Sequence, residues 1–213
     1  MERLVRFFVR KDFHGGPFWT IYTALVLAGL ILWGHSAYIL AKAWLGQYLI
    51  ADAWLQTLQS GQNEKPWPWA DTWPVARLKI PHNDIDQFVL AGDSGQALAF
   101  GPGHTSRSAL PGESGTVLIS GHRDTHFSFL KNLLVGDAIS LENPGGQSYQ
   151  YTVNAIHVVP EDLLIAADNE HSRLLLVTCW PFDGIASGAK FRYVVEAEQD
   201  GQLPVQAMVG WFW

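Results

Sequence analysis

The chain has a single cysteine, few charged side chains and no basic run beyond its N-terminus. One cysteine, Cys179, excludes an internal disulfide framework. Charged residues make up 16% of the sequence and the formal net charge is −6, which argues against a nucleic-acid-binding protein. Internal repeats and low-complexity tracts are also missing from the sequence, which excludes a solenoid. What the chain does have is 48% hydrophobic residues and ten tryptophans, enough for one folded domain with an accessory segment.

An uncharged apolar segment lies near the N-terminus, behind a basic flank. Residues 15–41 carry no charged side chain and are long enough to cross a bilayer, which takes about 20 residues. We therefore expect residues 17–41 to be a transmembrane anchor in the lipid bilayer, and residues 1–16 to stay cytoplasmic because positive flanks remain inside. A cleaved signal peptide is the alternative, with residues 35–37 as a weak cleavage site. The basic flank consists of Arg3, Arg6, Arg10 and Lys11.

Residues 42–74 are expected to form an amphipathic helix followed by a linker rich in Trp and Pro. Apolar residues recur at helical spacing from Trp44 to Leu58, and Gly61 suits the end of such a helix. This helix would continue the anchor outward, either as a plain stalk or folded back on the next domain. In the linker "EKPWPWADTWP" the prolines exclude a helix. Because exposed tryptophans are unfavourable in water, we expect it to dock on that domain rather than at the membrane interface.

From residue 75 onward the pattern changes to short apolar runs separated by turn signals. Only residues 127–134 and 161–168 have helical character, and both segments are short. Many short strands joined by Gly- and Pro-rich turns predict an all-β barrel or sandwich for residues 75–213. The predicted strands are residues 75–80, 86–92, 115–122, 137–142, 148–159, 173–179 and 191–198.

Three chemically capable residues stand at the ends of predicted strands. Cys179 ends "LLLVTC", His122 ends "TVLISGH" and Arg192 begins "FRYVVEAE". A neighbouring cation turns a thiol into a thiolate, and Cys with His is the usual nucleophile pair. Arg keeps its proton, so it suits an oxyanion or a substrate carbonyl. The pattern permits these residues to meet on one rim of a barrel, although a lone cysteine is more often a small buried hydrophobe.

At these residues the sequence resembles the sortase family of cysteine transpeptidases. "ALPGESGTVLISGHRDTHFSFLKNLLVGDAISL" resembles the sortase histidine region, "LLLVTC" its TLxTC motif and "FRYVV" its arginine strand. The resemblance covers about residues 75–198. The basic-flanked anchor, "WPWADTWPVARL" and "GPGH" are most similar to the proteobacterial class GN branch. Leu175 departs from the motif, since it stands where TLxTC has its first Thr, a position that we expect to be structural.

The resemblance implies an eight-stranded sortase-type β-barrel with short helices and a transpeptidase activity. Cys179 would attack a peptide carbonyl in the C-terminal, LPxTG-like sorting signal of an exported protein, and an amine acceptor would resolve the thioacyl intermediate. His122 would act as general acid and base, and Arg192 would hold the substrate and the oxyanion. We expect no cofactor and no metal site, while calcium dependence stays open because some sortases carry calcium-binding acids, and the resemblance leaves the amine acceptor open. It places the anchor in the inner (cytoplasmic) membrane and the catalytic domain in the periplasm.

Four further residues are expected to contact substrate: His104, Thr178, Trp180 and Phe182. By the resemblance, the connections at residues 157–172 and 180–190 wall the groove for the sorting signal. Trp180 and Phe182 would pack either on substrate or only within their loop. His104, in "GPGH", is expected in a turn or at the groove edge.

Metal binding and two other functions are the alternatives. "HRDTH" spaces His122 and His126 like a zinc pair on a helix, but it lacks the Glu of HExxH and His122 ends a strand. Acidic residues such as Glu161 and Asp162 match no calcium loop and are expected to be solvated. The functional alternatives are a membrane-anchored cysteine hydrolase, in which water resolves the intermediate, and a non-catalytic envelope scaffold with an inert Cys179.

Overall fold

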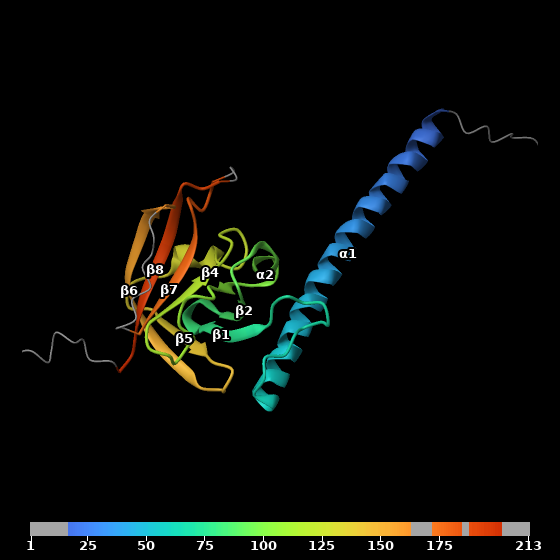
Figure 1. Ribbon diagram of the computed structural model, residues 1–213. Coiled ribbons are helices and arrows are strands. Elements are labelled where there is room, and N and C mark those ends of the chain that lie inside the picture. The colour runs from blue at the N-terminus through green and yellow to red at the C-terminus, as the bar shows by residue number, and fades with distance from the viewer. Residues whose placement is uncertain (1–16, 163–171, 185–187, 202–213) are drawn as a thin grey trace, which may run out of the picture. The chain divides into compact units, whose positions relative to one another are not determined.

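The computed structural model describes residues 17–162, 172–184 and 188–201, and the chain divides into two compact units, Met1–Leu45 and Gly46–Trp213. Helix α1 (Pro17–Ser60) crosses this boundary in the sequence (Figure 1). Within the described residues, it is the one helix long and apolar enough to cross a membrane. It ends before Gly61, whose φ of 69° is a left-handed conformation that glycine adopts readily. The expected continuity of the apolar and amphipathic segments is confirmed.

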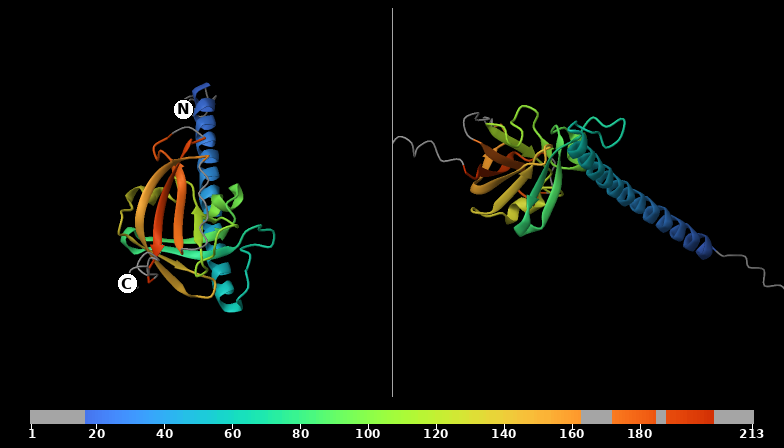
Figure 2. Two further views of the ribbon diagram at one scale, coloured as in Figure 1. Left: turned by 60° about the vertical axis from the view of Figure 1, so that its left-hand side comes forward. Right: turned by 90° about the horizontal axis from the view of Figure 1, so that it is seen from below.

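Eight strands of the second unit close into a barrel in the order β1-β2-β3-β4-β7-β8-β6-β5 (Figures 1 and 2). The pairs β2–β3 and β4–β7 are parallel, and the other pairs are antiparallel. Closure removes the sheet edges that would otherwise pair with another chain. All seven expected strands are confirmed, and the total of eight is the number that the resemblance implied. Their bounds are β1 (Pro74–Ile80), β2 (Ile85–Ala91), β3 (Gly103–His104), β4 (Thr116–Ser120), β5 (Ala138–Glu142), β6 (Ser148–Pro160), β7 (Arg173–Trp180) and β8 (Phe191–Gln199).

The short elements between the strands differ more from the prediction than the strands do. The sequence pattern does not predict β3 or helix α2 (Gly95–Phe100), because such short elements show no clear periodicity. The helix expected at residues 127–134 is only a 3₁₀ stretch, η2 (Ser128–Asn132), and a second one, η1 (Pro81–Asn83), links β1 to β2. The helix expected at residues 161–168 begins with two residues in a turn and otherwise lies outside the described residues.

Alternate residues of each strand fill the barrel interior. In β7, Leu174 and Leu176 belong to the main core together with Val117 and Ile119 of β4. The residues between them on β7 belong to a second cluster on the outer face of the barrel. Strand β7 is therefore buried on both faces, which explains its continuous apolar run. The second cluster, called the outer apolar cluster below, consists of Leu118, Val159, Leu175, Val177 and Val194.

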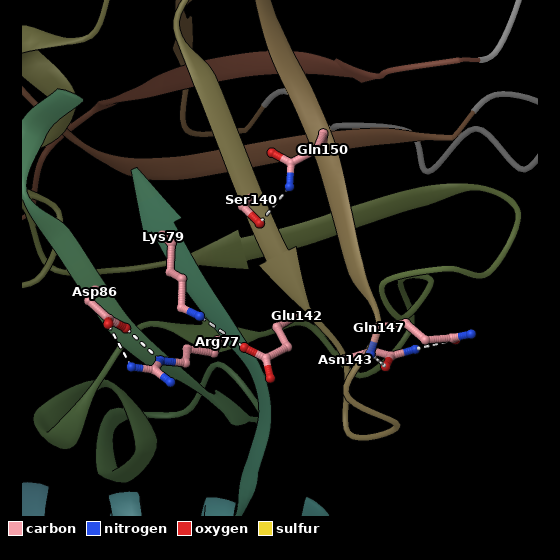
Figure 3. A network of polar contacts seen from close by, with 8 residues as sticks. All are labelled: Arg77, Lys79, Asp86, Ser140, Glu142, Asn143, Gln147 and Gln150. Atoms are coloured by element: carbon pink, nitrogen blue, oxygen red, sulfur yellow. Dashed lines mark hydrogen bonds and ion pairs between the residues drawn. The ribbon is translucent and has the colours of Figure 1, made fainter. Parts of the chain in front are cut away.

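The outer face around β1, β2 and β5 is polar instead (Figure 3). Arg77 donates two hydrogen bonds to Asp86, at 2.7 and 2.6 Å, and Lys79 lies 3.0 Å from Glu142. Solvent-exposed pairs of this kind contribute little stability each, but they keep this face in contact with water. The outer apolar cluster lies on the other side of the barrel, over β4, β7, β8 and β6. Figure 3 also includes Ser140, Asn143, Gln147 and Gln150.

The last part of α1, from Gly46 to Ser60, packs against the barrel within the second unit. Ile50 forms a buried cluster with Leu90 and Ala97, next to β2 and α2. The Trp54 ring is 1% exposed and packs against Phe88 with ring centroids 6.1 Å apart. This part of the helix is therefore folded back on the domain and is not a plain stalk.

The Trp/Pro linker docks on the barrel through two of its three tryptophans. Trp67 meets Phe100 edge to face at 5.1 Å, and Trp73 packs against the main core. Trp69 is 83% exposed, so the expected docking does not extend to this ring.

We expect Trp54→Ala to lower the free energy of unfolding by about 3–5 kcal/mol, because removing a buried ring leaves a cavity. Trp69→Ala is the matched control and should change it by at most about 0.5 kcal/mol. Urea denaturation of the full-length protein in detergent micelles, followed by circular dichroism, measures both. Equal effects would show that Gly46–Ser60 does not belong to the folded barrel unit.

Candidate active site

Cys179 and Arg192 are direct cross-strand neighbours. They are Cα partners in the antiparallel pair β7–β8, so their side chains leave the sheet on the same face. Alternation along β7 puts Cys179 on the outer face with Leu175 and Val177. Both Cys179 and Arg192 are partly exposed. A thiol and a guanidinium thus lie together where the outer apolar cluster ends.

His122 follows β4, the parallel neighbour of β7. The register pairs Ser120 with Val177, and the N–H of Gly121 donates to the Val177 carbonyl at 3.1 Å. Continued by two residues, this register brings His122 to the level of Cys179. The exposed imidazole is therefore placed at the same end of the sheet as the thiol.

Hydrogen bonds and close packing fix the turn that contains His122, both within the turn and from strand β7. The His122 carbonyl accepts hydrogen bonds from the N–H of Thr125 at 3.3 Å and of Phe127 at 3.0 Å. A Cβ at position 121 would lie 2.6 Å from the Phe127 ring, so the close packing requires Gly121. On the other side, the buried hydroxyl of Thr178 donates to the Gly121 carbonyl at 2.7 Å. Thr178, expected to contact substrate, thus supports the turn before His122.

Three acceptors hold the Arg192 guanidinium. Nη1 donates to the carbonyls of Ala189 at 2.8 Å and Phe191 at 3.3 Å, and Nη2 donates to Glu161 Oε1 at 2.5 Å. Glu161, expected to be a solvated acid, is 56% exposed and in addition forms an ion pair with Arg192. Sequence reasoning missed this pair because the two residues lie 31 positions apart. A guanidinium has five N–H donors, so capacity remains for a substrate oxygen.

Trp180 and Phe182 pack on each other and on Tyr193. Trp180 stacks on Tyr193 at 5.6 Å, and Phe182 meets the two rings edge to face, at 5.7 Å from Trp180 and 5.1 Å from Tyr193. Both expected substrate contacts remain partly exposed. These three rings form an aromatic cluster directly after the nucleophile candidate.

His104 lies in strand β3, so the expectation of a turn at this position is wrong. The residue is only 6% exposed. Its Nε2 lies 2.8 Å from the Ala109 carbonyl and 3.1 Å from the Ser108 hydroxyl. The ring thus anchors the loop that leads from β3 to β4.

His126 is half-buried, four residues after His122. Burial, and next the charge of His122, lower the pKa of His126, whereas a hydrogen bond with the Ala99 backbone acts in the opposite direction. The two histidines do not share a helix, which the zinc-pair spacing would require. Among the described residues, no group of three or more His, Cys, Asp or Glu side chains could hold a metal ion.

Arg123 is a buried cation that the sequence analysis missed. Its side chain is 9% exposed and donates to the carbonyls of Pro181 and Gly184, in the connection after β7. The feature of the sequence that could have identified Arg123 is its position directly after His122.

Comparisons with known proteins agree with this fold. The family model of the Sortase domain matches residues 78–200. Sortase D of Bacillus subtilis is 32% identical over 120 residues, and the match spans 55% of this chain and 60% of that protein. The structure also resembles sortase A from Corynebacterium diphtheriae, at 28% identity and a TM-score of 0.56, over 64% of this chain and 65% of that one. A Clostridium perfringens sortase D5 transpeptidase, at 21% identity, shares the fold over 73% of this chain and 96% of its own, with a TM-score of 0.59. The chain therefore belongs to the sortase family.

The lowered pKa of His126 predicts a pH dependence of stability. Below about pH 6.5 the unfolded chain binds a proton at this position more readily than the folded chain, so acidification favours unfolding. Wild type should therefore lose more free energy of unfolding between pH 7.5 and pH 5.5 than His126→Gln does. Urea denaturation at both pH values measures the difference, with the exposed His82→Gln as control. An unchanged loss in His126→Gln would contradict the prediction.

Proposed function

We propose that the protein is a membrane-anchored sortase, a cysteine transpeptidase that cleaves a C-terminal, LPxTG-like sorting signal of an exported protein and transfers the product to an amine acceptor. The strand register carries this proposal: it sets Cys179 opposite Arg192, and it puts His122 after the strand on the other side of β7. Membership of the sortase family supports it.

In the first half-reaction Cys179 is the nucleophile. Its thiolate adds to the carbonyl carbon of the scissile peptide bond, and the negative charge that forms on the oxygen is stabilised by Arg192. When the tetrahedral species collapses, the C–N bond breaks and His122 donates its proton to the leaving amine. A thioester between Cys179 and the acyl part of the substrate remains.

In the second half-reaction an amine acceptor resolves the thioester. Neutral His122 accepts a proton from the incoming amine as its nitrogen attacks the thioester carbonyl. Collapse breaks the C–S bond, releases the Cys179 thiolate and leaves a new amide bond. Water in place of the amine would give hydrolysis by the same residues, so added amine is the variable that separates the two outcomes.

The outer apolar cluster supports a binding face for the sorting signal beside Cys179. Its partly exposed members, Leu118 and Val159, lie beside the buried Leu175, Val177 and Val194, on a barrel whose opposite outer face carries ion pairs. The partly exposed Trp180 and Phe182 would form a wall near the scissile bond. Thr178 and His104, both buried, would act on substrate indirectly, Thr178 through the turn of His122 and His104 through its loop.

The apolar part of α1 supports membrane anchoring. We place it in the inner (cytoplasmic) membrane with residues 1–16 in the cytoplasm, because the basic flank precedes the span, and the barrel in the periplasm. The "WPWADTWPVARL" and "GPGH" segments and the basic-flanked anchor support a position in the proteobacterial class GN branch.

Incubation of the full-length protein with a library of LPxTG-like peptides should give a thioacyl adduct, detected by intact mass, and Cys179→Ala should give none. His122→Gln should lower kcat about 10²- to 10⁴-fold. Arg192→Lys should lower it about 10²- to 10³-fold, because a point charge replaces an oriented fork. Lys131→Arg, at an exposed position, is the control. Adduct formation by Cys179→Ala would refute the proposed nucleophile.

Two adjacent valines of β6 test the proposed binding face. Val159 belongs to the outer apolar cluster, whereas Val158 points to the other face and is 46% exposed. We expect Val159→Asn to raise KM about 5- to 30-fold with kcat nearly unchanged, because about 1–2 kcal/mol of apolar contact with the peptide is lost. Val158→Asn should leave both constants within about twofold. A reversed order would place the peptide elsewhere on the barrel.

A further inference from the structure

Arg123 is a buried cation next to the proposed catalytic base. Its side chain is 9% exposed, and its charged neighbour Asp124, 3.4 Å away, is 70% exposed. Burial of a guanidinium is unfavourable unless its donors are satisfied. Here the satisfying groups are two backbone carbonyls, those of Pro181 and Gly184. The residue therefore connects two backbone segments that lie about sixty positions apart in the sequence.

The two hydrogen bonds use the planar geometry of the guanidinium. Nη1 donates to the Pro181 carbonyl at 2.7 Å, and Nη2 donates to the Gly184 carbonyl. Two donors on one rigid plane fix both the distance and the orientation of the segment that they bind. The N–H of Gly184 closes this segment by donating to the Pro181 carbonyl at 3.3 Å.

A larger residue at position 184 would crowd the Arg123 guanidinium. A Cβ on Gly184 would lie 2.9 Å from Arg123 Nη1 and 3.3 Å from the Pro181 carbonyl oxygen. An added methyl group would therefore displace the guanidinium. Position 184 gives a way to disturb the contact while Arg123 itself is kept.

This contact is the second of two that join the segment of His122 to the segment of Cys179. On one side, Thr178 donates to the carbonyl of Gly121, so the residue before Cys179 holds the residue before His122. On the other side, Arg123, the residue after His122, holds Pro181, two residues after Cys179.

We propose that Arg123 is a positioning residue of the transpeptidation site, which fixes His122 relative to Cys179 by tying the histidine turn to the start of the β7–β8 connection. The inference rests on the proposed function. A displacement of about 1 Å between reacting groups lowers a rate about 100-fold, so the loss of this tie is expected in kcat. It should leave KM nearly unchanged, because Arg123 has little surface to offer a substrate.

The test uses the full-length protein in detergent, with Arg123→Met, Arg123→Lys and Gly184→Ala. We expect kcat to fall about 10- to 100-fold in Arg123→Met and in Gly184→Ala, with KM within about threefold. Arg123→Lys should recover part of the loss, because an ammonium still donates to one carbonyl. The matched controls are Lys131→Met, which removes an exposed cation, and Gly95→Ala, where an added Cβ meets nothing within 4 Å.

Hydrogen exchange of residues 120–128 and 180–184 separates this inference from the proposed function, because it needs no peptide. Faster exchange in both segments in Arg123→Met and Gly184→Ala, but not in the controls, supports the tie even if wild type cleaves no sorting signal. If Arg123→Met fails to fold, Gly184→Ala decides alone. Wild-type kcat in an active Gly184→Ala, unchanged exchange in both variants, or a loss confined to KM would each overturn the proposal.

Discussion

The placement of the whole site depends on the hydrogen bonding of strand β7 along both of its edges. Its parallel partner β4 leads into His122, and its antiparallel partner β8 carries Arg192 opposite Cys179. Side chains alternate along a strand, so a slip of one residue would turn Cys179 into the barrel and bring Thr178 to the outer face. The apolar residues of β7 prevent such a slip, because they fill the main core on one face and the outer apolar cluster on the other.

The sequence predicts this framework well because the framework follows from periodicity. Apolar runs between turn signals identify seven strands, and the motif residues fall at three strand ends that the barrel makes adjacent. The two-residue strand β3 escapes prediction, and with it the burial of His104, because a pattern needs more residues than that to appear. Contacts that depend on loop conformation escape as well. The pairing of Arg192 with Glu161 and the burial of Arg123 join segments whose proximity only the closed barrel determines.

The outer face of the barrel has a charged part and an apolar part. Around β1, β2 and β5, opposite charges pair across the strands, and these side chains remain in contact with water. Over β4, β7, β8 and β6, aliphatic side chains pack together beside the thiol. The proposed peptide would lie on the second face, beside its partly exposed members Leu118 and Val159. Under the proposed function, the placement of Cys179 at the end of that face would join peptide binding to the chemical step.

The parallel pairing of β4 with β7 also sets an order in which the molecule becomes functional during folding. Thr116 and Arg173 lie 57 positions apart, so the strands join only after a long loop has closed, and contacts of such separation form slowly. Hairpin pairs such as β1–β2 and β5–β6 involve short loops and assemble early. Cys179 therefore comes together with His122 and Arg192 late in folding, when β7 enters between β4 and β8, and an incomplete barrel does not yet hold these three residues in one place.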